Sequence, residues 1–301
     1  RFYIVDSETL KANENDGDWG QEYLLSNSAG TGAYSITAHD PNVETRMAKN
    51  NNYFLGISEM APDEAILRYN LDAPTVRTLI SNDEHDISSN WLPTDVKAAI
   101  GNSGDKLAKV VSAGGWYFKI NTTRAPLDDV NCRKSLAYAL DYDSLVGTFQ
   151  VTDDIAAGQK ARGPIPQGMI GYSDDVPLVE YNLDKAKDYL SKCKYSGDDL
   201  KITINWIAEV PFEESWALIL QQGAMAIGYE ASVETLPWAV FTEQVTKPET
   251  TPNLSIVAVQ AQTPDPDGLI YNMYHSAAAG TWQSTEWLQD DKIDAMLNSG
   301  R

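Results

Sequence analysis

Residues 200–236 read LKITINWIAEVPFEESWALILQQGAMAIGYEASVETL, and the fold class is most clearly indicated by these residues. Leu200 to Ile207 alternates apolar and polar residues, which is typical of a β-strand. Two acidic residues then begin a helix over Glu213–Ile227, where negative charge is favourable, and a second strand follows over Glu230–Leu236. A strand, a helix and a strand in this order predict a parallel pair joined by a crossover helix.

The same alternation continues towards the end of the sequence. It predicts a helix over Trp238–Val245, a strand over Leu254–Val259 and a helix over Asp267–Tyr274. Upstream, apolar residues recur at helical spacing from Val130 to Leu140, and Asn182 is placed to cap another helix. These patterns predict an α/β region over residues 120–301.

The first third of the chain is richer in strands. Gly30–Thr37 and Glu44–Ala48 indicate a hairpin, and a strand over Glu64–Leu71 is followed by a helix over Ala73–Ser81. We therefore expect two domains, residues 1–119 and residues 120–301. Gly114 and Gly115 lie close to this boundary and are a plausible hinge.

The charge balance excludes several function classes. Among 301 residues, 23 are Lys or Arg and 43 are Asp or Glu, so the formal net charge is −20. Such a chain repels nucleic acid and anionic membrane surfaces, and no cluster of basic residues interrupts the acidic background. Apolar runs such as Trp216–Leu220 are far shorter than the roughly 18 residues that predict a membrane span.

No constellation of catalytic or metal-binding residues emerges from the sequence. His39, His85 and His275 are scattered, and Cys132 and Cys193 lack the spacing of metal ligands. We therefore expect no metal, no cofactor and no catalytic residue. The two cysteines are interpreted as small buried hydrophobes, and a disulfide between them, which needs an oxidising compartment, stays open.

Tryptophan is the prominent residue type, with eight in the chain. Several lie at the ends of predicted strands or in loops, where a rigid scaffold presents side chains to a ligand. These are Trp91, Trp116, Trp206 and Trp282. Packing in the core is the commoner fate of any single tryptophan, and their clustering at element ends favours a stacking site.

Several stretches match a known family in the order in which that family carries them. The longest is FKINTTRAPLDDVNCRKSLAYALD, residues 118–141, and shorter ones are NSAGTGAY at 27–34, ISNDEHDI at 80–87, GPIP at 163–166 and DKAKDYL at 184–190. With these stretches the chain resembles the oligopeptide, dipeptide and nickel class of solute-binding proteins of ABC transporters.

This resemblance implies a periplasmic-binding-protein-like α/β fold: two lobes with mixed sheets flanked by helices, and a hinge between them. The chain would begin partway through the first lobe, and its second lobe would be truncated at the C-terminal end. The resemblance also implies a periplasmic protein or an extracytoplasmic lipoprotein. It would be a monomeric receptor that takes a small solute to a membrane permease and has no nucleic-acid partner.

The resemblance also points to a ligand segment. Peptide binders of this class carry Ala-Asp-Tyr-Pro-Asp-Pro, whose first Asp pairs with the amino terminus of the peptide. Here residues 261–266 read AQTPDP, so Gln262 stands in place of that carboxylate, and Gln260 should point the same way. We therefore expect a peptide without a free amine or an oligosaccharide-like solute. The predicted ligand-binding residues are Trp91, Trp116, Asn121, Trp206, Glu209, Gln260, Gln262 and Trp282.

Two other functions stay open at this point. One is a secreted glycoside hydrolase that uses a carboxylate pair among Glu209, Glu213 and Glu214, although no feature of the sequence indicates a raised carboxyl pKa. The other is a sensor or chaperone built on the same fold, since fold alone does not fix function.

Overall fold

The computed structural model describes residues 4–89, 92–102, 104, 107–110 and 112–301. Contacts divide the chain into two compact units, residues 1–79 and residues 80–301. Helix α3 (Ala73–Ser81) runs across this division.

The first unit is built on a small antiparallel sheet. Two short helices, α1 (Ser7–Ala12) and α2 (Gln21–Leu24), precede strands β1 (Tyr34–Asp40), β2 (Glu44–Lys49) and β3 (Glu64–Arg68). These strands pair in chain order, and both pairings are antiparallel. The predicted hairpin is therefore confirmed, with β1 and β2 as its arms.

Few side chains of this unit are buried. Among its described residues, only Gly20, Ala29, Thr45 and Val76 are buried, whereas Phe54 is 74% and Leu67 49% exposed. Because burial of apolar area is the main driving force of folding, this unit has little core of its own.

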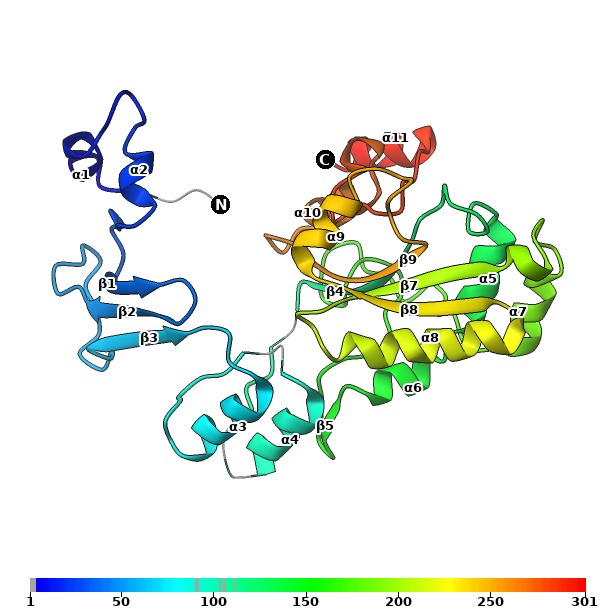
Figure 1. The fold of residues 1–301 in the computed structure, drawn as a ribbon, viewed down its shortest axis with the longest axis horizontal. Helices are drawn as coiled ribbons and strands as arrows, with labels where there is room; N and C mark the ends of the chain where they lie inside the picture. The colour runs from blue at the N-terminus through cyan, green and yellow to red at the C-terminus, as the bar shows by residue number, and fades with distance from the viewer. Residues whose placement is uncertain (1–3, 90–91, 103, 105–106, 111) are drawn as a thin grey trace. The chain divides into compact units, whose positions relative to one another are not determined.

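The second unit is organised around a four-stranded sheet. Its strands lie in the order β4 (Gly114–Ile120), β9 (Leu254–Gln260), β7 (Lys201–Ile207) and β8 (Glu230–Leu236) (Figure 1). β7 is parallel to both β8 and β9, while β4 is antiparallel to β9. The sheet is therefore mixed, as predicted, and its apolar residues on both faces explain why helices cover it on both sides.

One face of this sheet is covered by α8 (Glu213–Ile227), with α5 (Val130–Ala139) and α7 (Leu183–Leu190) packed against it (Figure 1). The buried residues of this layer include Ile204 of β7, Trp216 and Leu220 of α8, and Leu136 of α5. At Gly223 a side chain is impossible, because an added Cβ would lie 1.9 Å from the carbonyl oxygen of Ala139. Glycine thus allows α8 to approach α5.

The opposite face is covered by α9 (Trp238–Gln244) and α10 (Asp267–Tyr274). Phe241 of α9 and Leu269 of α10 are fully buried there against Val257 and Val259 of β9. The predicted α/β class is confirmed, and α8, β8 and α10 have the bounds that the sequence predicts.

The remaining elements of this unit are short. They are α4 (Thr94–Asn102), α6 (Tyr142–Gly147), β5 (Gln150–Thr152), β6 (Ile155–Ala156) and α11 (Asp291–Ser299), with 3₁₀ turns at Gly197–Asp199 and Ser276–Ala278. Within the described ranges, no helix combines the length and the apolar character that crossing a bilayer requires.

Strand β4 belongs to the sheet of the second unit. All seven of its residues pair with β9, from Gly114 opposite Gln260 to Ile120 opposite Leu254. From the sequence, most of this strand was assigned to residues 1–119. Trp116 and its partner Ala258 are about 140 positions apart, and local patterning does not reveal pairing over such a separation. The division into lobes at 119/120 and the hinge at Gly114–Gly115 stay predictions.

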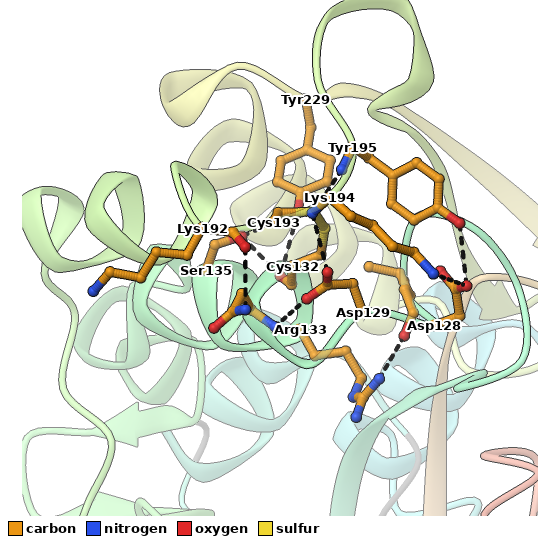
Figure 2. The surroundings of a disulfide bond; sticks show 12 residues. Asp128, Asp129, Cys132, Arg133, Ser135, Lys192, Cys193, Lys194, Tyr195 and Tyr229 are labelled. Atoms are coloured by element: carbon orange, nitrogen blue, oxygen red, sulfur yellow. Dashed lines mark hydrogen bonds and ion pairs between the residues drawn. A yellow bond between two sulfur atoms is a disulfide. The ribbon is translucent and has the colours of Figure 1, made fainter.

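A disulfide joins Cys132 in α5 to Cys193, just after α7 (Figure 2). Around it, the Asp129 carboxylate caps α5 by accepting from the Asn131 backbone N–H and also accepts from the backbone N–H of Lys194 at 3.0 Å. The disulfide, which the sequence leaves open, is present, and the interpretation of the two cysteines as unpaired hydrophobes is wrong. The cysteines are 61 positions apart in sequence, and they meet because α5 and α7 pack side by side.

We predict that reducing this disulfide destabilises the chain. Closing a loop of 61 residues lowers the entropy of the unfolded state, and native disulfides typically contribute about 2–4 kcal/mol. Urea unfolding with and without dithiothreitol should show a lower midpoint for the reduced chain. The variant with Cys132→Ser and Cys193→Ser should unfold at that lower midpoint under both conditions, and an unchanged midpoint of the native chain in dithiothreitol would contradict the prediction.

Candidate functional site

The order of the strands points to one edge of the sheet. From β7 the chain crosses to β8 on one side, and from β8 it crosses back to β9 on the other side of β7. The carboxyl ends of these three parallel strands share one edge, and the direction of the crossovers reverses between β7 and β9. Ligands of open α/β sheets bind outside the carboxyl ends of strands at such a switch point.

Glu209 follows β7 at this edge, and its carboxylate is held by the start of α9. The Trp238 backbone N–H donates to both carboxylate oxygens, at 3.1 Å to Oε1 and 3.0 Å to Oε2. The segment after β7 is thereby tied to the segment after β8. Glu209 is otherwise exposed, so its carboxylate retains capacity to accept further hydrogen bonds.

An aromatic pair lies beside this contact. The rings of Trp238 and Trp282 meet edge to face with centroids 5.3 Å apart, and Trp282 also packs on the core beneath α9 and α10. Trp238 remains 37% exposed. Sequence reasoning missed Trp238, although its position directly after a predicted strand was a signal that could have found it.

Gln260 and Gln262 stand at the end of β9, and both are exposed. Ala261 between them packs on the core beneath α9 and α10, so the two glutamines face away from that core, as the two-residue period of a strand predicts. Their contact with a ligand stays a prediction.

Trp116 and Trp206 lie on the other face of the sheet, in contact with the core that α8 covers. The ring of Trp116 is surrounded by Phe149, Phe212 and Trp216, with centroids 6.0, 5.7 and 5.6 Å away. These two tryptophans are thus half-buried packing residues, and the structure does not bring them together with Trp282.

Asn121 is fully buried and engaged with the protein. Its amide nitrogen donates to the carbonyl oxygens of Pro248 and Thr251, and its Oδ1 accepts from the backbone N–H and the hydroxyl of Thr123. In this arrangement Asn121 holds loops together and offers no exposed atom to a ligand. Trp91 lies outside the described residues.

Glu213 is the buried carboxyl group nearest to this edge in sequence. It is 1% exposed, and it accepts from the Ile207 backbone N–H at 3.1 Å and from the indole of Trp116. Burial raises the pKa of its carboxyl to about 8 despite these hydrogen bonds. The sequence predicted no raised carboxyl pKa here, because the signal comes from tertiary burial. Enclosed in this way, Glu213 cannot approach a glycoside, and the hydrolase alternative finds no support.

We predict that stability depends on pH through Glu213. Its pKa in the folded chain, about 8, exceeds the ordinary value of 4.5, so the folded state binds the proton more tightly. The stabilisation that this tighter proton binding gives to the folded state is complete below pH 4.5 and is lost as pH rises towards 8. The Glu213→Gln variant should therefore gain stability relative to the native chain by up to about 1.4 kcal/mol per pH unit in that window.

Urea unfolding at half-unit steps from pH 5 to pH 8.5 measures this difference. Glu214→Gln, at the exposed neighbouring position, is the matched control and should follow the pH dependence of the native chain. A difference between Glu213→Gln and the native chain that stays constant with pH would refute the prediction.

Gly114 fixes how closely β4 approaches β9 beside Gln260. A Cβ added at Gly114 would lie 2.0 Å from the Val259 carbonyl oxygen and 2.5 Å from the Cα of Gln260, whereas one added at Gly115 has no neighbour closer than 3.8 Å. Backbone atoms cannot yield as a flexible side chain does, so Gly114 permits the pairing that positions Gln260.

We predict unequal effects of alanine at these adjacent glycines. Gly114→Ala should lower the free energy of unfolding by about 1–3 kcal/mol, as overpacking does, and Gly115→Ala should change it by less than about 1 kcal/mol. Chemical denaturation of the two variants checks this. Equal losses for both would show that backbone freedom, and not the contact with β9, is what the glycines provide.

Among the described residues, Asp129, Cys132 and Cys193 form the single group of ligand-type side chains close enough to hold a metal ion. Both sulfur atoms are joined in the disulfide, and the carboxylate caps α5. The disulfide and the helix cap therefore explain why these three side chains lie close together.

Comparison with known proteins identifies the type of chain. The family model of bacterial extracellular solute-binding proteins, family 5 Middle, matches residues 1–281. The chain is 23% identical to the probable D,D-dipeptide-binding periplasmic protein DdpA of Escherichia coli over 98% of its own length and 55% of that protein. It is also 23% identical to heme-binding protein A of Haemophilus influenzae, over 92% of its length and 50% of that protein.

A solved structure is similar in fold. The oligopeptide-binding protein AppA of Bacillus subtilis, in complex with a nonapeptide, superposes with a TM-score of 0.77 at 20% identity, covering 98% of this chain and 59% of AppA. This agreement confirms the predicted α/β fold of the periplasmic-binding-protein type. The chain spans about half the length of the curated relatives it matches.

Proposed function

The chain belongs to the bacterial extracellular solute-binding proteins of family 5, and we propose that it is part of a receptor that captures a small solute for the membrane permease of an ABC importer. The observation that carries this proposal is the family match over residues 1–281. In addition, the crossovers of the sheet reverse direction at an edge that presents polar and aromatic side chains. A binding module of this kind catalyses no reaction and needs no cofactor, and we propose that it acts as a monomer.

The solute, in this proposal, meets the carboxyl edge of β7, β8 and β9. Glu209 and the two glutamines, Gln260 and Gln262, supply hydrogen-bonding groups, and Trp238 with Trp282 supplies an apolar surface. Solute sites commonly combine a few polar groups with aromatic walls in this way. Trp116 and Trp206 pack against the core on the α8 side of the sheet, whereas Asn121 lies at the other end of β9, beside Asn253.

We propose a solute that lacks a free ammonium group at Gln262. The relatives differ in the ligands that their names give, a D,D-dipeptide, heme and a nonapeptide, so the family alone does not choose among them. A glutamine amide donates and accepts hydrogen bonds without charge, whereas an enclosed ammonium needs a carboxylate partner. Amide-rich or hydroxyl-rich solutes, such as blocked peptides and oligosaccharides, meet this requirement.

An extracytoplasmic location is part of the proposal. The DdpA relative is named as periplasmic, and the Cys132–Cys193 disulfide adds independent support, since structural disulfides persist in oxidising compartments.

The role of Gln262 can be tested by changing its charge. We expect the native chain to bind N-acetyl-alanyl-phenylalanine at least as tightly as alanyl-phenylalanine in calorimetric titration. Gln262→Asp should reverse this preference by about tenfold or more, because a carboxylate gains an ammonium partner.

The matched control is Gln289→Asp, which makes the same charge change at an exposed position outside the sheet. It should leave the preference of the native chain unchanged. The assignment of Gln262 would be wrong if the native chain preferred the peptide with the free amine and Gln262→Asp left that preference unchanged. If neither peptide binds but cellobiose or maltotriose does, the solute is an oligosaccharide.

A further inference from the structure

A row of polar side chains crosses the middle of the four-stranded sheet. Lys119 of β4 is the register partner of Ser255 of β9, and Ser255 is the register partner of Asn205 of β7. All three are buried, with 2% of Lys119, 1% of Ser255 and 2% of Asn205 exposed. Three polar residues in register on adjacent strands place their side chains about 5 Å apart along the row.

The three side chains share the face that α9 and α10 cover. Residues two positions along each strand, Tyr117, Val257 and Ile207, belong to the core of that face. Since residues two apart on a strand project to the same side, the row lies beneath the same cover.

Glu286 pairs with Lys119 at one end of this row. Lys119 Nζ donates to Glu286 Oε1 at 2.6 Å and to the carbonyl oxygen of Gln283 at 2.7 Å. Burial lowers the pKa of the Lys119 ammonium and raises the pKa of the Glu286 carboxyl, and each charge opposes the shift of the other. The pair is therefore a desolvated one, which needs every remaining polar atom around it to be satisfied.

Three side-chain atoms of this row and of Glu286 have no hydrogen-bond partner among the described residues. They are Glu286 Oε2, Ser255 Oγ and Asn205 Oδ1, and all three are shielded from solvent. The large majority of buried side-chain polar atoms in proteins have a partner, so three unpartnered atoms under one face of the sheet demand an explanation. Two of the three N–H bonds of Lys119 have acceptors, which leaves one more donor in the same place.

We propose that Lys119, Asn205, Ser255 and Glu286 enclose a binding site for an internal water molecule. Such a water donates to Glu286 Oε2 and to Asn205 Oδ1 and accepts from the Ser255 hydroxyl or the Lys119 ammonium. Buried waters typically make about three hydrogen bonds of this kind. A metal cation fits poorly, because the Lys119 ammonium already occupies the carboxylate at 2.6 Å and would repel it.

The water has a structural task that no side chain here performs. It completes the ion pair between β4 and the segment that contains Glu286, and it connects that pair to Ser255 of β9 and to Asn205 of β7. Gln283 and Glu286 follow Trp282 in sequence, so this site anchors the segment that carries one wall of the proposed solute site. This last link rests on the proposed function, but the water site itself does not.

A crystal structure of the native chain at about 1.5 Å resolution tests the proposal directly. We expect density for an ordered water within hydrogen-bonding distance, about 2.7–3.2 Å, of Glu286 Oε2 and of at least one of Asn205 Oδ1 and Ser255 Oγ. An empty space, direct pairing of these side chains after rotation of the Asn205 amide, or an ion in the density would each overturn it.

A variant tests the same site independently. Asn205→Leu fills the space with an apolar group of similar volume, and its crystal structure should lack this water and show a lower thermal midpoint than the native chain. Ser135→Ala is the matched control, because the Ser135 hydroxyl is buried but already bonded to the carbonyl oxygen of Cys132. The control should retain the water at the Lys119 site, and its loss there would contradict the assignment. Should Asn205→Leu fail to fold, the native structure decides.

Discussion

The parallel pairing of β7 with both β8 and β9 is the constraint on which the rest of the second unit depends. β7 buries Ile204 against one layer of helices and Ile207 against the other, so it must lie inside the sheet. Crossovers between parallel strands are right-handed, and the chain leaves β7 towards β8 but returns past it to β9. Helices α8 and α9 therefore fall on opposite faces, and the three carboxyl ends gather at one edge.

The elements near this strand could be predicted because their patterns are local. The two acidic residues that open α8 and the alternation along β7 and β8 are visible in the sequence alone. The pairing of Cys132 with Cys193 and of β4 with β9 could not be predicted in the same way. Each depends on contacts between segments far apart in the chain, about which local periodicity carries no information.

The candidate site was predicted in part. Glu209, Gln260 and Gln262 lie at the carboxyl edge, where a strand end in the sequence already indicates exposure. Trp116 and Trp206 lie on the face under α8, because they sit within their strands and a strand alternates its faces. Trp238, one residue beyond Pro237 at the end of β8, escapes that alternation and joins Trp282. The distinction between a tryptophan within a strand and one just beyond it is thus the physical reason for the different outcomes.

Buried ionisable groups are concentrated around the same sheet. Glu213 lies under one face of the sheet, and the Lys119–Glu286 pair lies under the other. The exposed groups at the carboxyl edge, in contrast, include the amides of Gln260 and Gln262, the indole of Trp238, and the carboxylates of Glu209 and Asp265. A reversible binding site requires this arrangement, in which a rigid interior supports exposed side chains that can still form hydrogen bonds with a solute.

Hydrogen–deuterium exchange of the native chain, with and without the solute that binds most tightly, shows which edge of the sheet the solute covers. We expect slower amide exchange in residues 207–210, 236–239 and 260–263, which follow β7, β8 and β9 at the carboxyl edge. Slower exchange confined to residues 200–203 and 230–232, at the amino ends of β7 and β8, would contradict this expectation.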